Sequence, residues 1–112
     1  MNLEQIISNL HLEVLTTNKP FSEVFPSGGY TSDLLSCVMA GAKQQNLWIT
    51  LQSHSNIVAI AALLEISAVI ITEDARPDEA TISKANEENV ILLATKEFSY
   101  SIVGKLWEMG LK

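Results

Sequence analysis

The chain has 112 residues, of which 47% are hydrophobic and 18% are charged. This length supports one hydrophobic core, so we expect residues 1–112 to form a single domain. The net charge of −6 argues against general binding to DNA or RNA, which needs Lys and Arg to neutralise phosphates, and against binding to anionic membranes. The surplus of apolar residues predicts a large core, an apolar contact surface or both, and favours a homo-oligomer.

Cysteine usage and hydropathy predict the compartment. Cys37 is the single cysteine, so this chain cannot form an internal disulfide or hold an iron–sulfur cluster alone. The first residues lack a basic segment followed by an apolar stretch, so we expect no signal peptide. The longest apolar run, 57–64, is far shorter than the roughly 20 residues that span a bilayer. We therefore expect a cytoplasmic protein without membrane contact.

Short elements are predicted at the start of the chain. Apolar residues at helical spacing predict an amphipathic helix over 3–10. Alternation predicts a strand at 11–16, at the edge of a sheet, and a second short strand at 21–25. Pro and Gly at 26–29 predict a break in the chain.

The polar segment 31–33 offers capping side chains for a helix predicted over 34–42. An unbroken apolar strand is then expected at 47–51, followed by the polar loop 52–56. The remaining predicted elements are a helix over 57–66, a strand over 68–72, a polar helix from the cap Asp78 to about Glu88, a strand over 90–94 and a last helix after Thr95. Alternating strands and helices imply a parallel sheet between helices. The predicted fold class is therefore α/β, a three-layer sandwich with a mainly parallel sheet.

The polar loop 52–56 is the first candidate site. It lies between the carboxyl end of a strand and the amino end of a helix, where open α/β sheets bind ligands and backbone N–H groups accept anions. His54 can donate to a phosphate or act as an acid or base. The alternative is that Ser53 or Ser55 caps the helix and that His54 is simply exposed. The candidate ligand-binding residues of this loop are Gln52, Ser53, His54, Ser55 and Asn56.

A second candidate site precedes the helix at 34–42. Its glycines allow a backbone to approach a ligand closely, although the pattern matches neither common phosphate-binding motif. The alternative is a tight turn with a helix cap. If the two strands are neighbours, both loops converge on a nucleotide or anion, a point that the sequence leaves open. The candidate residues are Gly28, Gly29, Tyr30, Thr31, Ser32 and Asp33.

Metal and cofactor sites are not predicted. Glu73, Asp74 and Asp78 follow a strand, as Mg²⁺ ligands do in some hydrolases, but no nucleophile or second ligand set accompanies them, so we interpret them as a solvated loop. His11 and His54 lack the spacing of metal ligands. We expect no cofactor, no metal and no Ser-His-Asp or Cys-His catalytic set.

The sulfur-containing and aromatic side chains are interpreted as structural. Cys37 belongs to a helical stripe, so we expect a buried, inert thiol. Trp48 and Trp107 are expected as core or interface anchors, and Met39 and Met109 as side chains that fill gaps in the core.

The segment from residue 48 to residue 95 resembles the DRTGG domain. That family has a strand, a polar loop with Asp-Arg-Thr, an Ala/Leu-rich helix, a strand ending in Thr-Gly-Gly, a proline and a polar helix. Thr72 and Pro77 match the threonine and the proline, whereas 53–55 replaces Asp-Arg-Thr and 73–74 replaces Gly-Gly. Over roughly 28–110 the framework matches, and Thr72 joins the candidate ligand residues. The matching segment reads WITLQSHSNIVAIAALLEISAVIITEDARPDEATISKANEENVILLAT.

A preceding segment, GGYTSDLLSCVMAGA, resembles short stand-alone bacterial and archaeal relatives, some described as serine kinases or as iron–sulfur hydrogenase-associated proteins. Domains of this family precede the kinase domain of HPr kinase/phosphorylase and occur in phosphate acetyltransferases and beside CBS domains in pyrophosphatases. The resemblance implies an α/β accessory domain that supports dimer assembly and regulation.

Three functional hypotheses remain. The first is a non-catalytic regulatory or scaffold module that forms a homodimer and contacts a metabolic or redox enzyme. The second is a sensor that binds a nucleotide or anion at the polar loops. The third is a small hydrolase or phosphotransferase that uses His54 and Asp33. The sequence leaves the ligand and the partner open.

Overall fold

The computed structural model describes residues 1–17 and 19–112. Within these residues, one five-stranded sheet has the strand order β1-β5-β4-β3-β2. Only β1 is antiparallel, in its pairing with β5, and the other neighbours are parallel. This confirms the mainly parallel sheet and the edge position of the first strand. The strands are β1 (Glu13–Val14), β2 (Gly28–Thr31), β3 (Asn46–Thr50), β4 (Ala68–Ile71) and β5 (Leu92–Ala94).

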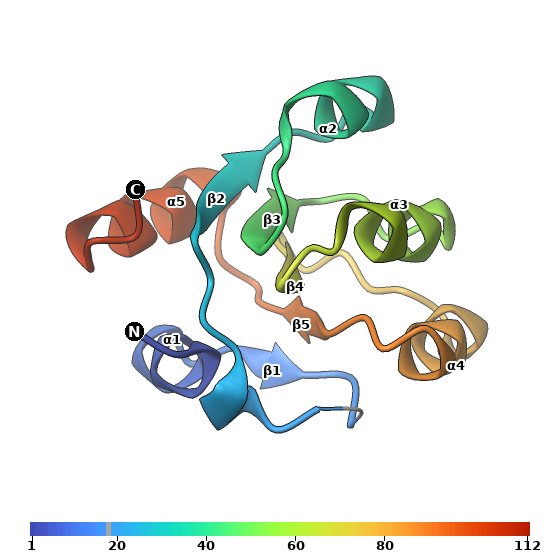
Figure 1. Ribbon diagram of the computed structural model, residues 1–112, viewed down its shortest axis with the longest axis horizontal. Helices are drawn as coiled ribbons and strands as arrows, with labels where there is room; N and C mark the ends of the chain where they lie inside the picture. Colours follow the sequence, from blue (N-terminus) through green and yellow to red (C-terminus); the bar gives the residue numbers. More distant parts are fainter. Residues whose placement is uncertain (18) are drawn as a thin grey trace.

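Helices cover both faces of this sheet, as Figure 1 shows, with α1 and α5 on one side and α2, α3 and α4 on the other. The architecture is therefore the predicted three-layer α/β sandwich. None of the helices in the described part of the chain is long and apolar enough to cross a bilayer. The helices are α1 (Leu3–Leu10), the 3-10 helix η1 (Phe21–Glu23), α2 (Leu35–Gly41), α3 (Asn56–Leu64), α4 (Glu79–Glu87) and α5 (Ser99–Glu108).

The sheet separates two hydrophobic cores, and β3 contributes to both. Leu47 and Ile49 pack with α1 and α5, whereas Trp48 packs with the helices on the opposite face. Successive side chains of a strand point to opposite faces, so an unbroken apolar run is what a strand buried on both sides requires. Each such buried side chain contributes roughly 1.5–3 kcal/mol of stability.

The predicted strand at 21–25 is wrong. Residues Phe21–Glu23 form the 3-10 helix η1, in which the N–H groups of Glu23 and Val24 donate to the carbonyls of Pro20 and Phe21. Phe21 and Val24 both pack on the core beside α1, whereas Phe25 is 60% exposed. A spacing of three residues places two side chains on one side of a helical turn, and this burial overrides the apparent alternation.

The predicted break at 26–29 is also wrong at its second half. Gly28 and Gly29 begin β2, which pairs with Asn46 and Leu47 of β3. Pairing with a neighbouring strand overrides the low strand propensity of glycine. The two glycines therefore lie at the amino end of an edge strand and not directly before a helix.

Two of the predicted helix caps differ from the structure. Leu34 is the N-cap of α2 and Ser55 is the N-cap of α3, and neither side chain makes a capping hydrogen bond. The predicted cap of α4 is confirmed, because the Asp78 carboxylate accepts a hydrogen bond from the Thr81 N–H.

Some expected core side chains lie on the surface. Cys37 is exposed, which corrects the prediction of a buried thiol, and Met39 is also exposed. Trp48 is fully buried as expected, whereas Trp107 is 58% exposed. A helix that covers a sheet buries only the side chains on the face that it turns to the sheet. Cys37 and Met39 on α2 and Trp107 on α5 lie outside that buried face.

Candidate functional site

Most of the predicted ligand residues lie at the carboxyl edge of the sheet. Thr31 ends β2 and is followed by Ser32 and Asp33, the loop 52–55 follows β3, and Thr72 follows β4. Parallel neighbours place these chain segments at one edge. Gly28, Gly29 and Tyr30 lie earlier in β2.

The two candidate loops converge through Asp33. Its Oδ1 accepts hydrogen bonds from the Thr50 hydroxyl at 2.8 Å and from the Leu51 N–H at 2.9 Å. The Gln52 side-chain amide donates to the Asp33 carbonyl at 3.1 Å. The loop after β2 is thus joined directly to the loop after β3, and a point that the sequence left open is decided.

Further polar groups at this edge also have partners within the protein. The Trp48 indole N–H donates to the Ser32 carbonyl at 3.0 Å, and the Thr31 hydroxyl donates to the Ile49 carbonyl at 3.0 Å. These contacts join the ends of β2 and β3. The Thr31 hydroxyl, a predicted ligand group, therefore has a partner within the sheet.

The first N–H groups of α3 bond to acceptors in the loop directly before the helix. The Asn56 N–H donates to the His54 Nδ1 at 3.2 Å, the Ile57 N–H to the His54 carbonyl at 3.1 Å and the Val58 N–H to the Ser55 carbonyl at 3.1 Å. The His54 side chain thus accepts the first N–H of α3, whereas the side chain of the N-cap Ser55 makes no capping hydrogen bond. Because these N–H groups already have acceptors, an anion at this helix end would have to displace them.

His54 also lies near the start of α4. Hydrogen bonds from Thr81 lower the pKa of the Asp78 carboxyl, and the charge of a protonated His54 lowers it further. Among the described residues, His54 and Asp33 share no hydrogen bond, and the side chains of Ser53 and Ser55 have no hydrogen-bond partner. Two hydroxyl groups are therefore open to solvent or a ligand.

Thr72 is fully buried beneath this edge. Its hydroxyl lies 3.3 Å from the Thr50 carbonyl, to which it donates, and 2.5 Å from the Ser99 hydroxyl. The Glu73 carboxylate accepts the Ser99 N–H at 3.3 Å. Thr72 therefore joins β4 to β3 and to α5.

Glu73 and Asp74 replace the Gly-Gly pair of the DRTGG pattern, and both adopt the left-handed conformation, with φ values of 61° and 62°. This conformation favours glycine. The backbone geometry therefore explains why the DRTGG pattern has two glycines where this chain has Glu73 and Asp74. Their N–H groups donate to the carbonyls of Glu97 and Thr95. In the part of the chain that the structure describes, no group of three or more His, Cys, Asp or Glu side chains is placed to hold a metal ion.

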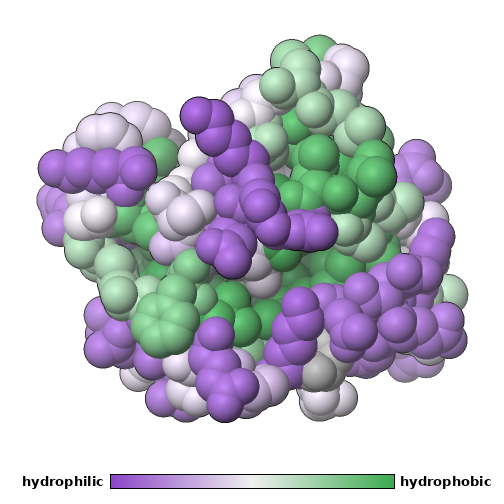
Figure 2. Space-filling view, in the orientation of Figure 1, coloured by the Kyte–Doolittle hydropathy of each residue, from purple (hydrophilic) through white to green (hydrophobic). Residues whose placement is uncertain are grey.

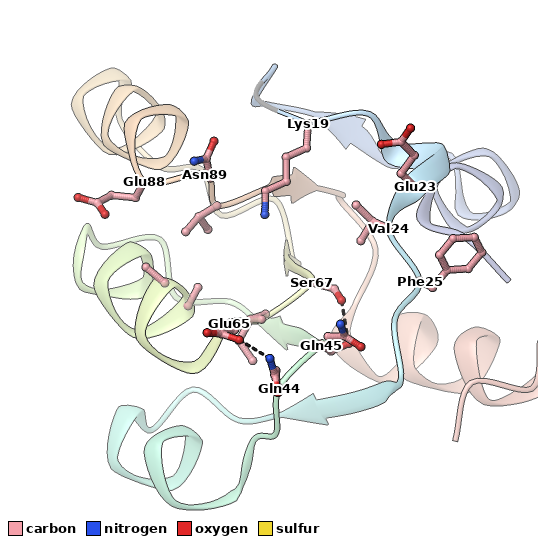
Figure 3. A pocket seen from close by; sticks show the side chains of 14 residues that line it. Lys19, Glu23, Val24, Phe25, Gln44, Gln45, Glu65, Ser67, Glu88 and Asn89 are labelled. Atoms are coloured by element: carbon pink, nitrogen blue, oxygen red, sulfur yellow. Dashed lines mark hydrogen bonds between the residues drawn. The ribbon is translucent and has the colours of Figure 1, made fainter.

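A polar hollow of about 420 Å³ lies at the opposite, amino edge of the sheet (Figure 3). The Gln44 amide donates to the Glu65 carboxylate, and the Ser67 hydroxyl donates to the Gln45 carbonyl at 2.8 Å. Gln45, Glu65 and Asn89 line this hollow in the left-handed conformation. Its polar residues lie in the short connections before β3, β4 and β5, where no sequence pattern indicates a site.

Apolar side chains are exposed on α5 and near α2. Tyr100 is 92% exposed, and a narrow groove of about 120 Å³ runs between β2 and the Val103 and Trp107 side of α5. Figure 2 shows a second hydrophobic area in the region where Figure 1 places α2 and α3. These surfaces offer area for contact with another protein.

Comparison with known proteins supports the fold. The sequence matches no family model and no curated protein. Its structure is similar to a crystal structure of the CBS and DRTGG domains of the regulatory region of Clostridium perfringens pyrophosphatase, complexed with the activator diadenosine tetraphosphate. The TM-score is 0.72 at 21% identity, and the match covers 90% of this chain and 45% of that one. The chain therefore has a DRTGG-like α/β fold and spans about half the length of the regulatory region that it matches.

Proposed function

We propose that the chain is a regulatory or scaffold module that forms a homodimer and contacts a metabolic or redox enzyme, with no catalysis of its own. Its fold is that of a regulatory region in the structural neighbour. The internal hydrogen bonds of Asp33, Thr50 and Thr72 also support a structural role for the carboxyl edge.

The observation that carries the dimer is the exposed face of α5. Tyr100, Val103, Gly104 and Trp107 follow helical spacing, and Tyr100 and Trp107 are 92% and 58% exposed. A Cβ added at Gly104 would meet nothing within 4 Å. A glycine in a helix interior costs roughly 0.5–1 kcal/mol relative to alanine, and no contact within the part of the chain that the structure describes requires it. The open backbone between two aromatic residues suits close packing against another helix.

A second copy of the chain fits this face. If two α5 helices pack antiparallel about a two-fold axis near Gly104, Tyr100 of one chain lies against Trp107 of the other. Such self-complementary contacts are the rule in two-fold dimers. The face continues into the groove beside β2, an edge strand of the sheet, which extends the contact area.

Sedimentation equilibrium at micromolar concentration tests the dimer. We expect the wild-type chain to sediment as a dimer and the double variant Tyr100→Ser, Trp107→Ser as a monomer. Leu63→Ser, which changes another exposed side chain on the opposite layer, is the matched control and should remain dimeric. A wild-type monomer at all concentrations contradicts the dimer, and loss of the dimer in the Leu63 variant contradicts the use of α5.

Cross-linking in the native host tests the partner. We expect cross-links within the dimer and from the module to an enzyme. If all links join copies of this chain, the enzyme contact is refuted while the dimer stands. The exposed, unpaired Cys37 fits a reducing compartment, so we propose that these contacts form in the cytoplasm.

The carboxyl edge supports a second candidate function, in which the module senses a nucleotide or anion. The convergence of both loops on Asp33 and the open hydroxyl groups of Ser53 and Ser55 favour it. A ligand at about 100 times its dissociation constant should stabilise the fold by about 2.7 kcal/mol. A thermal-shift screen with nucleotides, phosphate and acyl phosphates measures this gain.

Two variants separate binding from folding in this screen. Ser53→Ala and His54→Ala should remove the ligand-dependent shift, and Ser53→Ala should leave the unliganded protein as stable as the wild type. No shift with any compound, or a shift that survives both substitutions, contradicts a sensor at this edge.

A further inference from the structure

We propose that a hollow at the outer edge of β2 binds an oxyanion, a carboxylate or a phosphate group, through the side-chain amide of Asn46. The hollow has a volume of about 450 Å³, and Gly28, Lys43, Asn46 and Lys112 line it. It lies at the amino end of β2, whereas the candidate loops lie at the carboxyl end. This inference does not rest on the proposed ligand site at the carboxyl edge, and the hollow shares Lys112 with the groove of the proposed dimer face.

Asn46 is the residue that points to a ligand. Its side chain is almost completely buried, with 8% of the residue exposed. Its Oδ1 accepts the Lys43 N–H at 2.9 Å, and its backbone N–H and carbonyl bond to Lys43 and Ser67. Its Nδ2 has no hydrogen-bond partner among the described residues. A buried donor without an acceptor costs stability, and an acceptor oxygen in the hollow removes that cost.

Gly28 leaves this amide open to the hollow. A Cβ at Gly28 would lie 3.4 Å from the Asn46 Nδ2 and 3.2 Å from the Lys112 carbonyl oxygen. Any side chain larger than hydrogen would therefore cover the amide. The glycine accounts for the access of a ligand, in addition to its place in the strand.

The Lys43 ammonium favours an anion in the hollow, whereas the backbone oxygen of Lys112, 3.2 Å from a Cβ at Gly28, is an acceptor beside it. The chain has a net charge of −6 and seven Lys and Arg residues, and two of these, Lys43 and Lys112, line this hollow. Lys43 makes no ion pair within the described residues, in contrast to Arg76 and Lys105. The Lys112 ammonium lies over the Trp107 ring, 5.5 Å from its centre. An ammonium group only donates hydrogen bonds, and the Asn46 NH₂ offers two donors, so both groups match oxygens that carry negative charge.

NMR titration of the full chain tests the site. Inorganic phosphate and malonate are titrated separately at constant ionic strength, and the side-chain NH₂ signals of Asn46 and the backbone signal of Gly28 are followed. We expect both residues to shift together and to saturate. Tighter binding of phosphate identifies a phosphate-type ligand, and tighter binding of malonate identifies a carboxylate. Unchanged Asn46 signals with both anions, or equal shifts with chloride, overturn the proposal.

Asn46→Asp keeps the acceptor for the Lys43 N–H and replaces the donor by a carboxylate. We expect it to weaken anion binding at least about tenfold, the size expected for a hydrogen bond to a charged group. Lys43→Gln should weaken binding by a smaller factor, about two- to fivefold, that decreases with added salt. Wild-type affinity in Asn46→Asp overturns the proposal.

Two glycine variants test anion binding at the hollow even if Asn46→Asp does not fold. Gly28→Ala places a methyl group before the amide and should weaken binding at least about tenfold. Gly29 also lines the hollow, but successive strand positions point to opposite faces, and a Cβ at Gly29 would meet Ile49 and Leu47 at 3.7 Å and not Asn46. Gly29→Ala is therefore the matched control and should bind as the wild type does. Equal affinities of the two variants overturn the proposal.

Discussion

A single carboxylate oxygen of Asp33 joins the ends of two strands. It accepts the Thr50 hydroxyl and the Leu51 N–H, two donors that would otherwise lose their partners at the end of β3. A carboxylate has acceptors only, which suits a position where two donors converge. This oxygen therefore holds the ends of β2 and β3 together.

We predict that Asp33→Ala lowers the free energy of unfolding by about 3 kcal/mol, because two hydrogen bonds to a charged group, each contributing roughly 1.5–3 kcal/mol, are lost. Asp33→Asn keeps an acceptor oxygen and should recover more than half of the loss. Urea denaturation measures both values. If Asp33→Ala is as stable as the wild type, the hydrogen bonds do not hold the strand ends together.

Residue chemistry was predictable where the partner is close in sequence. Asp78 lies three residues before the Thr81 N–H that it caps, so local spacing was sufficient. Asp33 accepts from residues 17 and 18 positions away, and the same kind of side chain was therefore misassigned as a local cap. Only the pairing of β2 with β3 brings these groups together.

At the scale of elements, the charged side chain of Glu97 stabilises the start of α5. The Glu97 carboxylate accepts hydrogen bonds from the Lys105 ammonium at 2.6 Å and the Ser101 hydroxyl at 2.9 Å. The hydrogen bond from Lys105, followed by that from Ser101, lowers the pKa of Glu97 below its ordinary value of 4.5. A lowered pKa in the folded state means that the ionised carboxylate stabilises the fold.

Glu97 makes the stability of the fold depend on pH. The contribution of Glu97 is fully present above its unfolded pKa of about 4.5 and disappears as the pH falls through the lower folded pKa. We predict that Glu97→Gln is less stable than the wild type near neutral pH and that the difference shrinks below this value. Urea unfolding across the acid range measures it. A difference that stays constant with pH contradicts the assignment.

Replacing the exposed Gly104 of α5 should affect folding and assembly in opposite directions. We predict that Gly104→Ala raises the stability of the monomer by about 0.5–1 kcal/mol, because alanine favours the helix and its Cβ meets no neighbour. The same methyl group should weaken the dimer by holding two α5 helices apart. Thermal unfolding at low concentration and sedimentation equilibrium measure the two effects. A stabilised monomer with unchanged dimer affinity contradicts packing at Gly104.

At the scale of the molecule, one sheet is shared by two hydrophobic cores. Trp48 belongs to the core on the side of α2, α3 and α4, and its strand neighbours Leu47 and Ile49 belong to the other. Because β3 cannot leave one core and stay in the other, we expect both to unfold together.

We predict a single cooperative transition for this domain. In the variant Trp107→Phe, Trp48 is the sole tryptophan, and its fluorescence reports the core beside α3. The midpoint of its change in urea should coincide with the loss of helical circular dichroism. Separate midpoints show that the two cores unfold independently.

The sequence by itself determined the fold class. Unbroken apolar runs at β3, β4 and β5 require burial on both faces, and the helices between them require parallel crossovers. Tertiary structure decided the rest. Residues Gly28–Thr31 became a strand because β3 offers an open edge, and 21–25 became a helical turn because Phe21 and Val24 face one core. Three further features depend on contacts between residues far apart in the chain, which local patterns do not encode. They are the convergence of the polar loops, the unpaired side-chain amide of Asn46 among the described residues, and the exposed face of α5.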